Sequence, residues 1–211
     1  MNATVPVKPR LRGVSHQYAA VAAVPMAGVL IAHANGQPSA WLYGICLFFL
    51  FAVSATYHRV SWNEHQRKFW RRMDHSMIFI FIAGSYTPFG LELLNQDALG
   101  TQMLSAIWIT AILGAAVTVA WPSAPKWFRA ILYLTAGWML AVTFPKTYEL
   151  LGGAAMGLIL GSGFLYSLGA IIYARKSPNP WPYTFGYHEI FHILVIAAAW
   201  MHYAGIYAWL Y

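Results

Sequence analysis

Long apolar stretches alternate with short polar breaks along the whole chain. The apolar stretches run over about 15–34, 38–58, 74–94, 101–121, 128–146, 153–174 and 185–209. A helix of about 20 residues is long enough to cross the roughly 30 Å hydrocarbon core of a bilayer. The breaks are rich in Gly, Asn and Pro, as in 35–38 and 177–180, which is typical of turns. The pattern predicts seven membrane-spanning helices.

The expected fold class is an all-α, polytopic membrane protein. Backbone groups in lipid must pair within the protein, and these stretches are too long for barrel strands, so a helical bundle is predicted. Residues 1–14 are expected to form a cytoplasmic tail and residues 15–211 a single domain of seven helices. Composition agrees, since 59% of the 211 residues are hydrophobic and only 9% are charged. Few soluble domains are this apolar.

The basic residues predict the orientation of the bundle. With the N-terminus in the cytoplasm, alternating loops place all of the thirteen Lys and Arg residues except Lys146 on the cytoplasmic side. This bias predicts a cytoplasmic N-terminus and an outside C-terminus. The net charge of +7 does not indicate a nucleic-acid partner, because the basic residues lie in short loops between apolar stretches rather than on one soluble face. The expected partner is the membrane.

Four ionisable side chains fall at the cytoplasmic ends of three predicted spans. His58 ends the second span, Asp74 opens the third, and His188 and His192 lie in the first turns of the seventh. Residues four apart share one face of a helix, a spacing that suits two ligands of one ion. With His58 they would form a three-histidine Zn²⁺ site with an open fourth position, which is typical of catalytic zinc. The single cysteine, Cys46, excludes a closed structural site built from cysteines.

Each of these residues also has a simpler interpretation. Any one histidine could be a buried polar group bonded to a neighbour. Asp74 could be the N-cap of the third helix, although a catalytic role in holding a water molecule is the favoured hypothesis. Ser54 lies one turn before His58 and could orient the site, or its hydroxyl could bond back to its own helix.

The segment His188–His192 also matches the H-E-x-x-H pattern of zinc proteases. Glu189 could therefore be a general base, an acceptor for a ligand N–H group, or a charge favoured near a helix N-terminus. No downstream acidic third ligand accompanies the pattern, so the protease interpretation is not favoured. The remaining histidines are not expected to be metal ligands: His16, His33, His65, His75 and His202. His16 and His75 fall at the cytoplasmic level, and His16 could reach the rim of the site.

Three motifs resemble the hemolysin III family, which belongs with the adiponectin receptors in the progestin and adipoQ receptor superfamily. They are Ser54–His58, Arg71–Ser76 continuing to Ala83–Phe89, and Tyr187–His192. The resemblance covers essentially the whole chain in span count and orientation. It implies a bacterial-type member in the plasma (inner) membrane, with a seven-helix bundle and zinc near the cytoplasmic face.

The resemblance also implies roles for single residues. The family's zinc-binding histidines fall on His58, His188 and His192, its aspartate holding the zinc-bound water falls on Asp74, and its serine falls on Ser54. These are the residues that spacing and depth indicate independently.

The leading functional hypothesis is a zinc-dependent hydrolase of a membrane lipid amide or ester. The resemblance implies ceramidase-like chemistry, because the eukaryotic relatives are associated with ceramide hydrolysis. The alternatives are a non-enzymatic sensor or regulator of membrane homeostasis with structural zinc, and a pore-forming haemolysin. No protein hormone is expected as a partner, because no large extramembrane domain is predicted.

Overall fold

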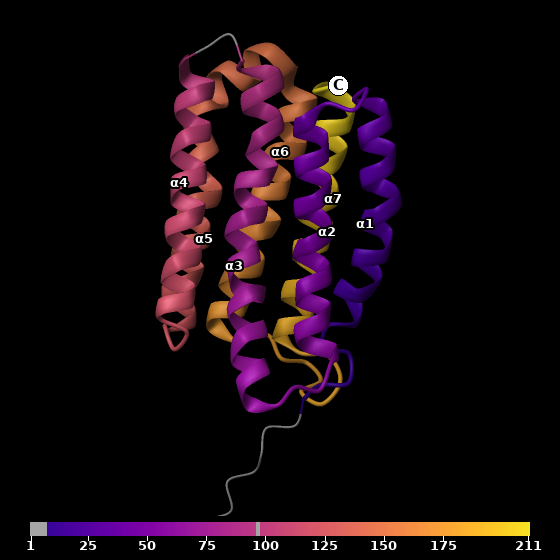
Figure 1. Cartoon of the computed structure of the whole chain (residues 1–211), viewed down its shortest axis with the longest axis vertical. Helices are drawn as coiled ribbons and strands as arrows, with labels where there is room; N and C mark the ends of the chain where they lie inside the picture. Colours follow the sequence, from indigo (N-terminus) through magenta and orange to yellow (C-terminus); the bar gives the residue numbers. More distant parts are fainter. Residues whose placement is uncertain (1–7, 96–97) are drawn as a thin grey trace, which may run out of the picture.

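The computed structural model describes residues 8–95 and 98–211, and these residues are almost entirely helical (Figure 1). Between them the described ranges contain one isolated β-bridge, from Trp181 to Phe185, which confirms the all-helical prediction. The elements are α1 Val14–His33, α2 Pro38–Arg59, α3 Glu64–Pro88, the π-helical turn η1 Phe89–Leu93, α4 Ala98–Ala120, α5 Lys126–Trp138, the 3₁₀ segment η2 Met139–Thr143, α6 Phe144–Arg175 and α7 Tyr187–Trp209.

The helices run side by side along the long axis of the molecule (Figure 1). Along the chain α1 packs on α2, α2 on α3, and α3 on α4, while α5 packs on α6 and α6 on α7. Contacts of α1 with α7 and of α3 with α5 join the two halves of the bundle. The end of α2, the start of α3 and the start of α7 therefore share one end of the molecule.

The protein is a membrane protein with several spanning helices. In the described residues, six helical stretches are long and apolar enough to cross a bilayer. The longest, Lys126–Arg175, has 50 residues and combines α5, η2 and α6. Gly152 interrupts it with a non-helical backbone at φ 77° and ψ −179°, at one of the predicted breaks.

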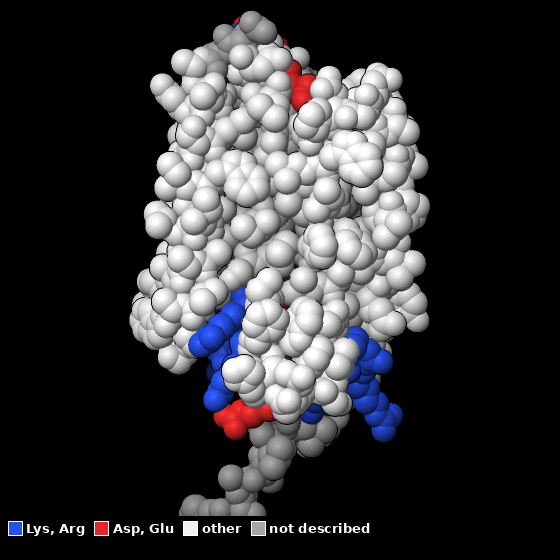
Figure 2. Space-filling model, viewed as in Figure 1, with Lys and Arg blue, Asp and Glu red and all other residues white. Residues whose placement is uncertain are grey.

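Large apolar side chains cover the sides of the bundle, and charged groups gather at its ends. Val21, Ile112 and Phe164 are each exposed by 60% or more, as expected for surfaces that face lipid. Figure 2 shows Lys and Arg gathered at one end of the visible face. We call this the basic end; α2 ends there at Arg59 and α7 begins there at Tyr187.

The third helix begins ten residues earlier than the hydrophobic pattern predicts. It starts at Glu64 rather than at 74, and a capping box joins Asn63 and Gln66 at its first turn. Hydropathy misses these polar turns because they are stabilised by the cap and not by burial. Asp74 consequently lies in the interior of α3, and its interpretation as an N-cap is wrong.

The predicted spans 128–146 and 153–174 also have different limits in the structure. The first is helical from Lys126 but tightens into η2 at Met139–Thr143. The second is merged with the end of the first, since α6 starts at Phe144, with Pro145 in its first turn. Proline is favoured there because its fixed φ suits the start of a helix.

Candidate metal centre

Three histidines from two helices meet inside the basic end of the bundle. The Nε2 atoms of His58 and His188 lie 3.2 Å apart, and the nearest ligand atoms of His58, His188 and His192 all lie within 4.8 Å of one another. His188 and His192 stand one turn apart on α7 with ring centroids 4.6 Å apart, as the four-residue spacing predicts. The predicted convergence of the three imidazoles is confirmed.

The geometry of the cluster fits a small divalent cation. All three histidines are at least 92% buried, and the described residues offer no partner to the Nδ1 atoms of His188 and His192. Ligand nitrogens at 2.0–2.1 Å from a tetrahedral metal are about 3.3 Å apart, close to the observed 3.2 Å between His58 and His188. The same 3.2 Å also suits a hydrogen bond between the two imidazoles, so the cluster has room for a shared cation without requiring one.

The start of α1 presses directly against His58. Gly13 has a left-handed backbone at φ 79°, and a Cβ atom placed on it would lie 2.5 Å from the Cβ of His58. Only glycine combines this backbone with so close an approach. The N-terminal segment thereby fixes the position of one candidate metal ligand.

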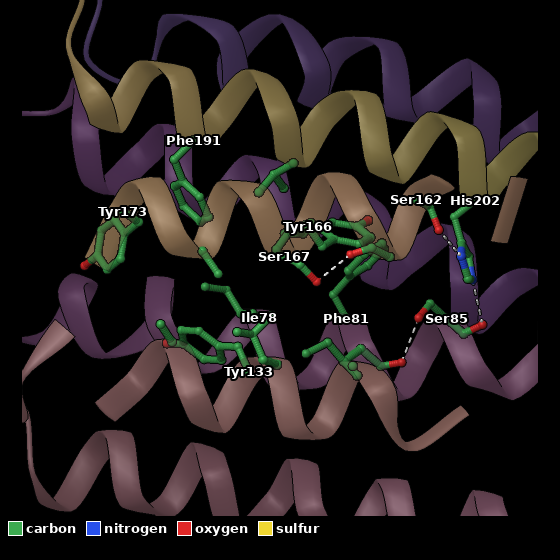
Figure 3. A pocket seen from close by; sticks show the side chains of 18 of the residues that line it. Ile78, Phe81, Ser85, Tyr133, Ser162, Tyr166, Ser167, Tyr173, Phe191 and His202 are labelled. Atoms are coloured by element: carbon green, nitrogen blue, oxygen red, sulfur yellow. Dashed lines mark hydrogen bonds between the residues drawn. The ribbon is translucent and has the colours of Figure 1, made fainter. Parts of the chain in front are cut away.

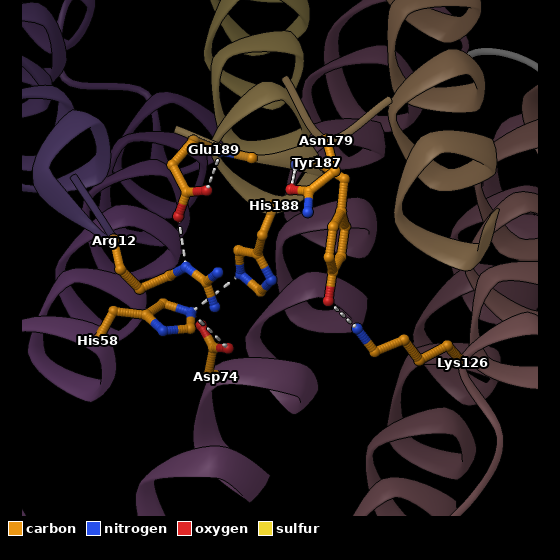
Figure 4. Close-up of polar contacts among 9 residues, drawn as sticks. Arg12, His58, Asp74, Lys126, Asn179, Tyr187, His188 and Glu189 are labelled. Carbon is orange, nitrogen blue, oxygen red and sulfur yellow. Dashed lines mark hydrogen bonds and ion pairs between the residues drawn. The ribbon is translucent and has the colours of Figure 1, made fainter. Parts of the chain in front are cut away.

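Glu189 caps α7 and pairs with the N-terminal segment (Figure 4). Its Oε2 accepts a hydrogen bond from the Gly186 N–H at 2.8 Å, and its Oε1 accepts one from Nε of Arg12. The Glu189 side chain is only 3% exposed, so the arginine neutralises a buried charge. Both carboxylate oxygens of Glu189 accept hydrogen bonds. Of its three predicted roles, this arrangement matches a charge held at a helix N-terminus.

Asp74 and Ser54 lie beside the histidine cluster. The Asp74 Oδ2 is 3.8 Å from the Nε2 of His58, which is near it but too far for a direct hydrogen bond. The Ser54 hydroxyl lies near the Asp74 carboxylate. Both residues line the same cavity as His188 and His192. The structure therefore brings together all five residues predicted for the site.

Two further residues contact the site, and neither was expected among its metal-binding or catalytic residues. The ring of His16 stacks on that of His192, with centroids 3.8 Å apart and planes 10° apart, and Arg12 reaches Glu189. For His16, the sequence offered one signal, its position at the cytoplasmic level of the membrane. For Arg12, it offered none. Of the other histidines, His65 is exposed on α3, His33 stacks on Tyr207, and His75 and His202 line the cavity.

A largely apolar cavity of about 150 Å³ leads from the histidine cluster into the bundle. Its wall is built from α1, α2, α3, α5, α6 and α7, and it extends along α7 from His188 to His202. Figure 3 shows aromatic and aliphatic side chains such as Phe81, Ile78 and Phe191 pointing into it. The candidate metal centre thus lies at one end of a chamber suited to an apolar chain.

Comparison with known proteins finds relatives that match most of the chain. The family model described as "Haemolysin-III related" matches residues 5–203. The chain is 31% identical over 194 residues to "Hemolysin-3" of Bacillus cereus, covering 89% of this chain and 85% of that one. It is 34% identical over 179 residues to "Monocyte to macrophage differentiation factor" of Homo sapiens, covering 82% and 71%.

A third relative shares the same region within a longer protein. "Adiponectin receptor protein" of Drosophila melanogaster is 32% identical over 183 residues, which cover 77% of this chain and 39% of that protein. The family model spans every helix that contributes to the histidine cluster, including the start of α1 and most of α7. The chain therefore belongs to the haemolysin-III related family.

Proposed function

We propose that the protein is a zinc-dependent hydrolase that cleaves an amide or ester bond of a membrane lipid. The observation that carries the proposal is the meeting of three histidine donors and one carboxylate at the end of a mostly apolar cavity. Such a cavity can hold an acyl chain while the polar bond to be cleaved lies at the histidine cluster. Neither a structural staple nor a pore requires this combination.

Zinc is the proposed metal because of the donor set. Three imidazoles without a thiolate suit zinc, and three protein ligands leave a position open for water or substrate. Bound there, zinc would supply Lewis-acid activation of water and of the substrate carbonyl group. His58, His188 and His192 would hold it.

Asp74 is the proposed proton carrier of the reaction. Hydrolysis joins the oxygen of water to the carbonyl carbon, breaks the bond to the leaving nitrogen or oxygen, and transfers one proton to that leaving atom. The Asp74 carboxylate, 3.8 Å from His58 Nε2, can accept this proton at an oxygen and pass it on. Ser54 would orient the carboxylate through its hydroxyl, while the apolar wall excludes other water.

We also propose that the bundle has seven spans, with the N-terminus in the cytoplasm, the C-terminus outside and the bacterial inner membrane as its location. The stretch Lys126–Arg175 has 50 residues, more than twice the length that one crossing needs. Its two parts, α5 and α6, pack against each other, which supports two passes joined near Gly152. The gathering of Lys and Arg at the basic end supports the orientation.

The test replaces the proposed base without removing the metal ligands. Asp74→Asn is expected to retain one zinc ion per chain and to lose turnover of a ceramide-like lipid by about a hundred-fold or more, the usual contribution of a general base. Glu149→Gln is the matched control, because Glu149 is exposed and pairs with Lys146, away from the cavity, and it should keep full turnover. Unchanged turnover of the Asp74→Asn protein at full zinc content would refute the proposed role.

A further inference from the structure

One tyrosine of the cavity has a hydroxyl without a partner. The Oη atom of Tyr166 is buried and makes no hydrogen bond to any described residue, and Tyr166 lines the cavity. Its ring packs edge-on against Phe81, with centroids 6.5 Å apart. Buried hydroxyl groups are nearly always paired, so this hydroxyl is available to a partner within the cavity.

The free hydroxyl belongs to a small polar region at the cavity end remote from the histidine cluster. Tyr166 and Ser162 are four residues apart and share one face of α6. Long side chains on a helix lean toward its N-terminus, which here directs Tyr166 toward Ser162. Ser162 Oγ lies 3.3 Å from Nδ1 of His202, and His202 Nε2 lies 3.4 Å from the carbonyl oxygen of Ser85. We call Tyr166, Ser162, His202 and Ser85 the far subsite (Figure 3).

The far subsite stands at a fixed distance from the histidine cluster. His192 and His202 are ten residues apart on α7, a rise of about 15 Å along the helix. The cavity wall between the two levels is mainly apolar, with Ile82 and Val195 among its residues. A ligand that satisfies both ends therefore has polar groups separated by an apolar chain.

We propose that the far subsite binds a hydroxyl or carbonyl oxygen carried on the acyl chain of the ligand. The protein then selects oxygenated acyl chains over plain hydrocarbon chains of the same length. The inference rests on the proposed function only in taking a lipid as the occupant of the cavity. Ser162 and His202 hold each other in place, and the Tyr166 hydroxyl supplies the unused donor for the ligand oxygen.

A second tyrosine of the same cavity provides a matched comparison. Tyr133 also lines the cavity, but its hydroxyl donates to the carbonyl oxygen of His75 at 3.2 Å. Because this hydroxyl already has a partner in the protein, it has less to offer a ligand. Replacing each tyrosine by phenylalanine removes one oxygen from the same chamber, yet only Tyr166→Phe should change ligand selection.

The experiment measures binding and requires no turnover. Zinc-loaded, purified protein is titrated with saturated fatty acids of increasing length and with their ω-hydroxy derivatives. At the length that spans the cavity, the ω-hydroxy acid is expected to bind about five-fold tighter to the wild type, as one added hydrogen bond predicts. Tyr166→Phe should abolish this preference, and Tyr133→Phe should retain it.

Three results would overturn the inference. These are equal affinity for both acids in the wild type, an unchanged preference in Tyr166→Phe, or a Tyr166→Phe protein that melts below the wild type. The last would mean that the hydroxyl has a partner within the protein. A protein that selects the ω-hydroxy acid but cleaves no lipid would refute the proposed hydrolysis alone, whereas cleavage without selection would refute only the far subsite.

Discussion

Replacing Gly13 by alanine tests whether the N-terminal segment positions a metal ligand. The substitution strains the backbone, because Gly13 has φ 79°, and it places a Cβ atom 2.5 Å from the Cβ of His58. The left-handed backbone alone costs an alanine about 1–2 kcal/mol. The close contact must be relieved by moving His58, so the metal site should change together with the stability.

Gly36→Ala separates these two effects. Gly36 has almost the same backbone, with φ 77°, but a Cβ atom placed on it would meet no neighbouring atom within 4 Å. It should therefore lose about 1–2 kcal/mol of stability through strain and leave the metal site intact. Any additional loss in Gly13→Ala measures the contact with His58.

The assay is zinc affinity by competition with a chelator, combined with thermal unfolding of both variants. Gly13→Ala is expected to bind zinc about ten-fold or more weakly, within the range seen when groups that support a metal ligand are altered. Gly36→Ala should bind zinc as the wild type does. Equal zinc affinity in the two variants would refute the claim that Gly13 positions His58.

Two further predictions concern the same end of the bundle. Arg12→Ala should lower the free energy of unfolding by about 3–5 kcal/mol, because it leaves the buried carboxylate of Glu189 without its countercharge. Lys68→Ala breaks an exposed pair with Glu64 and should change the stability much less; similar losses in denaturation would contradict this. Removing zinc with a chelator should lower the melting temperature reversibly, since zinc at about one hundred times its Kd stabilises the fold by about 2.7 kcal/mol. The melting temperature of a His58→Ala protein should not depend on zinc. An identical melting temperature of the wild type with and without zinc would contradict the proposed metal site.

The lengths of the apolar stretches predicted the helices that are stabilised by burial in lipid. It failed at the start of α3, where residues 64–73 are polar and a capping box at Asn63 begins the helix. It also did not foresee the 3₁₀ turn η2, because helix tightening depends on packing between neighbours. Polar or tightly packed turns carry little of the signal that a hydropathy pattern measures.

The candidate metal site was predictable where its residues share a helix face or a membrane level. The four-residue spacing of His188 and His192, and the position of His58 at the end of a span, were sufficient. The contacts of Gly13 with His58 and of Arg12 with Glu189 join residues far apart in the chain. Such contacts follow from how α1 docks on α2 and α7, which no local pattern in a single sequence records.

His58, His188 and His192 are proposed to hold one metal ion jointly. The most direct measurement is elemental analysis of protein purified under zinc-replete conditions, for the wild type and for alanine variants of each histidine. About one zinc ion per chain is expected in the wild type. It should be lost in all three variants and retained in His65→Ala, where the histidine is exposed on α3. A wild type free of metal, or zinc retained in any of the three variants at the same affinity, would contradict it.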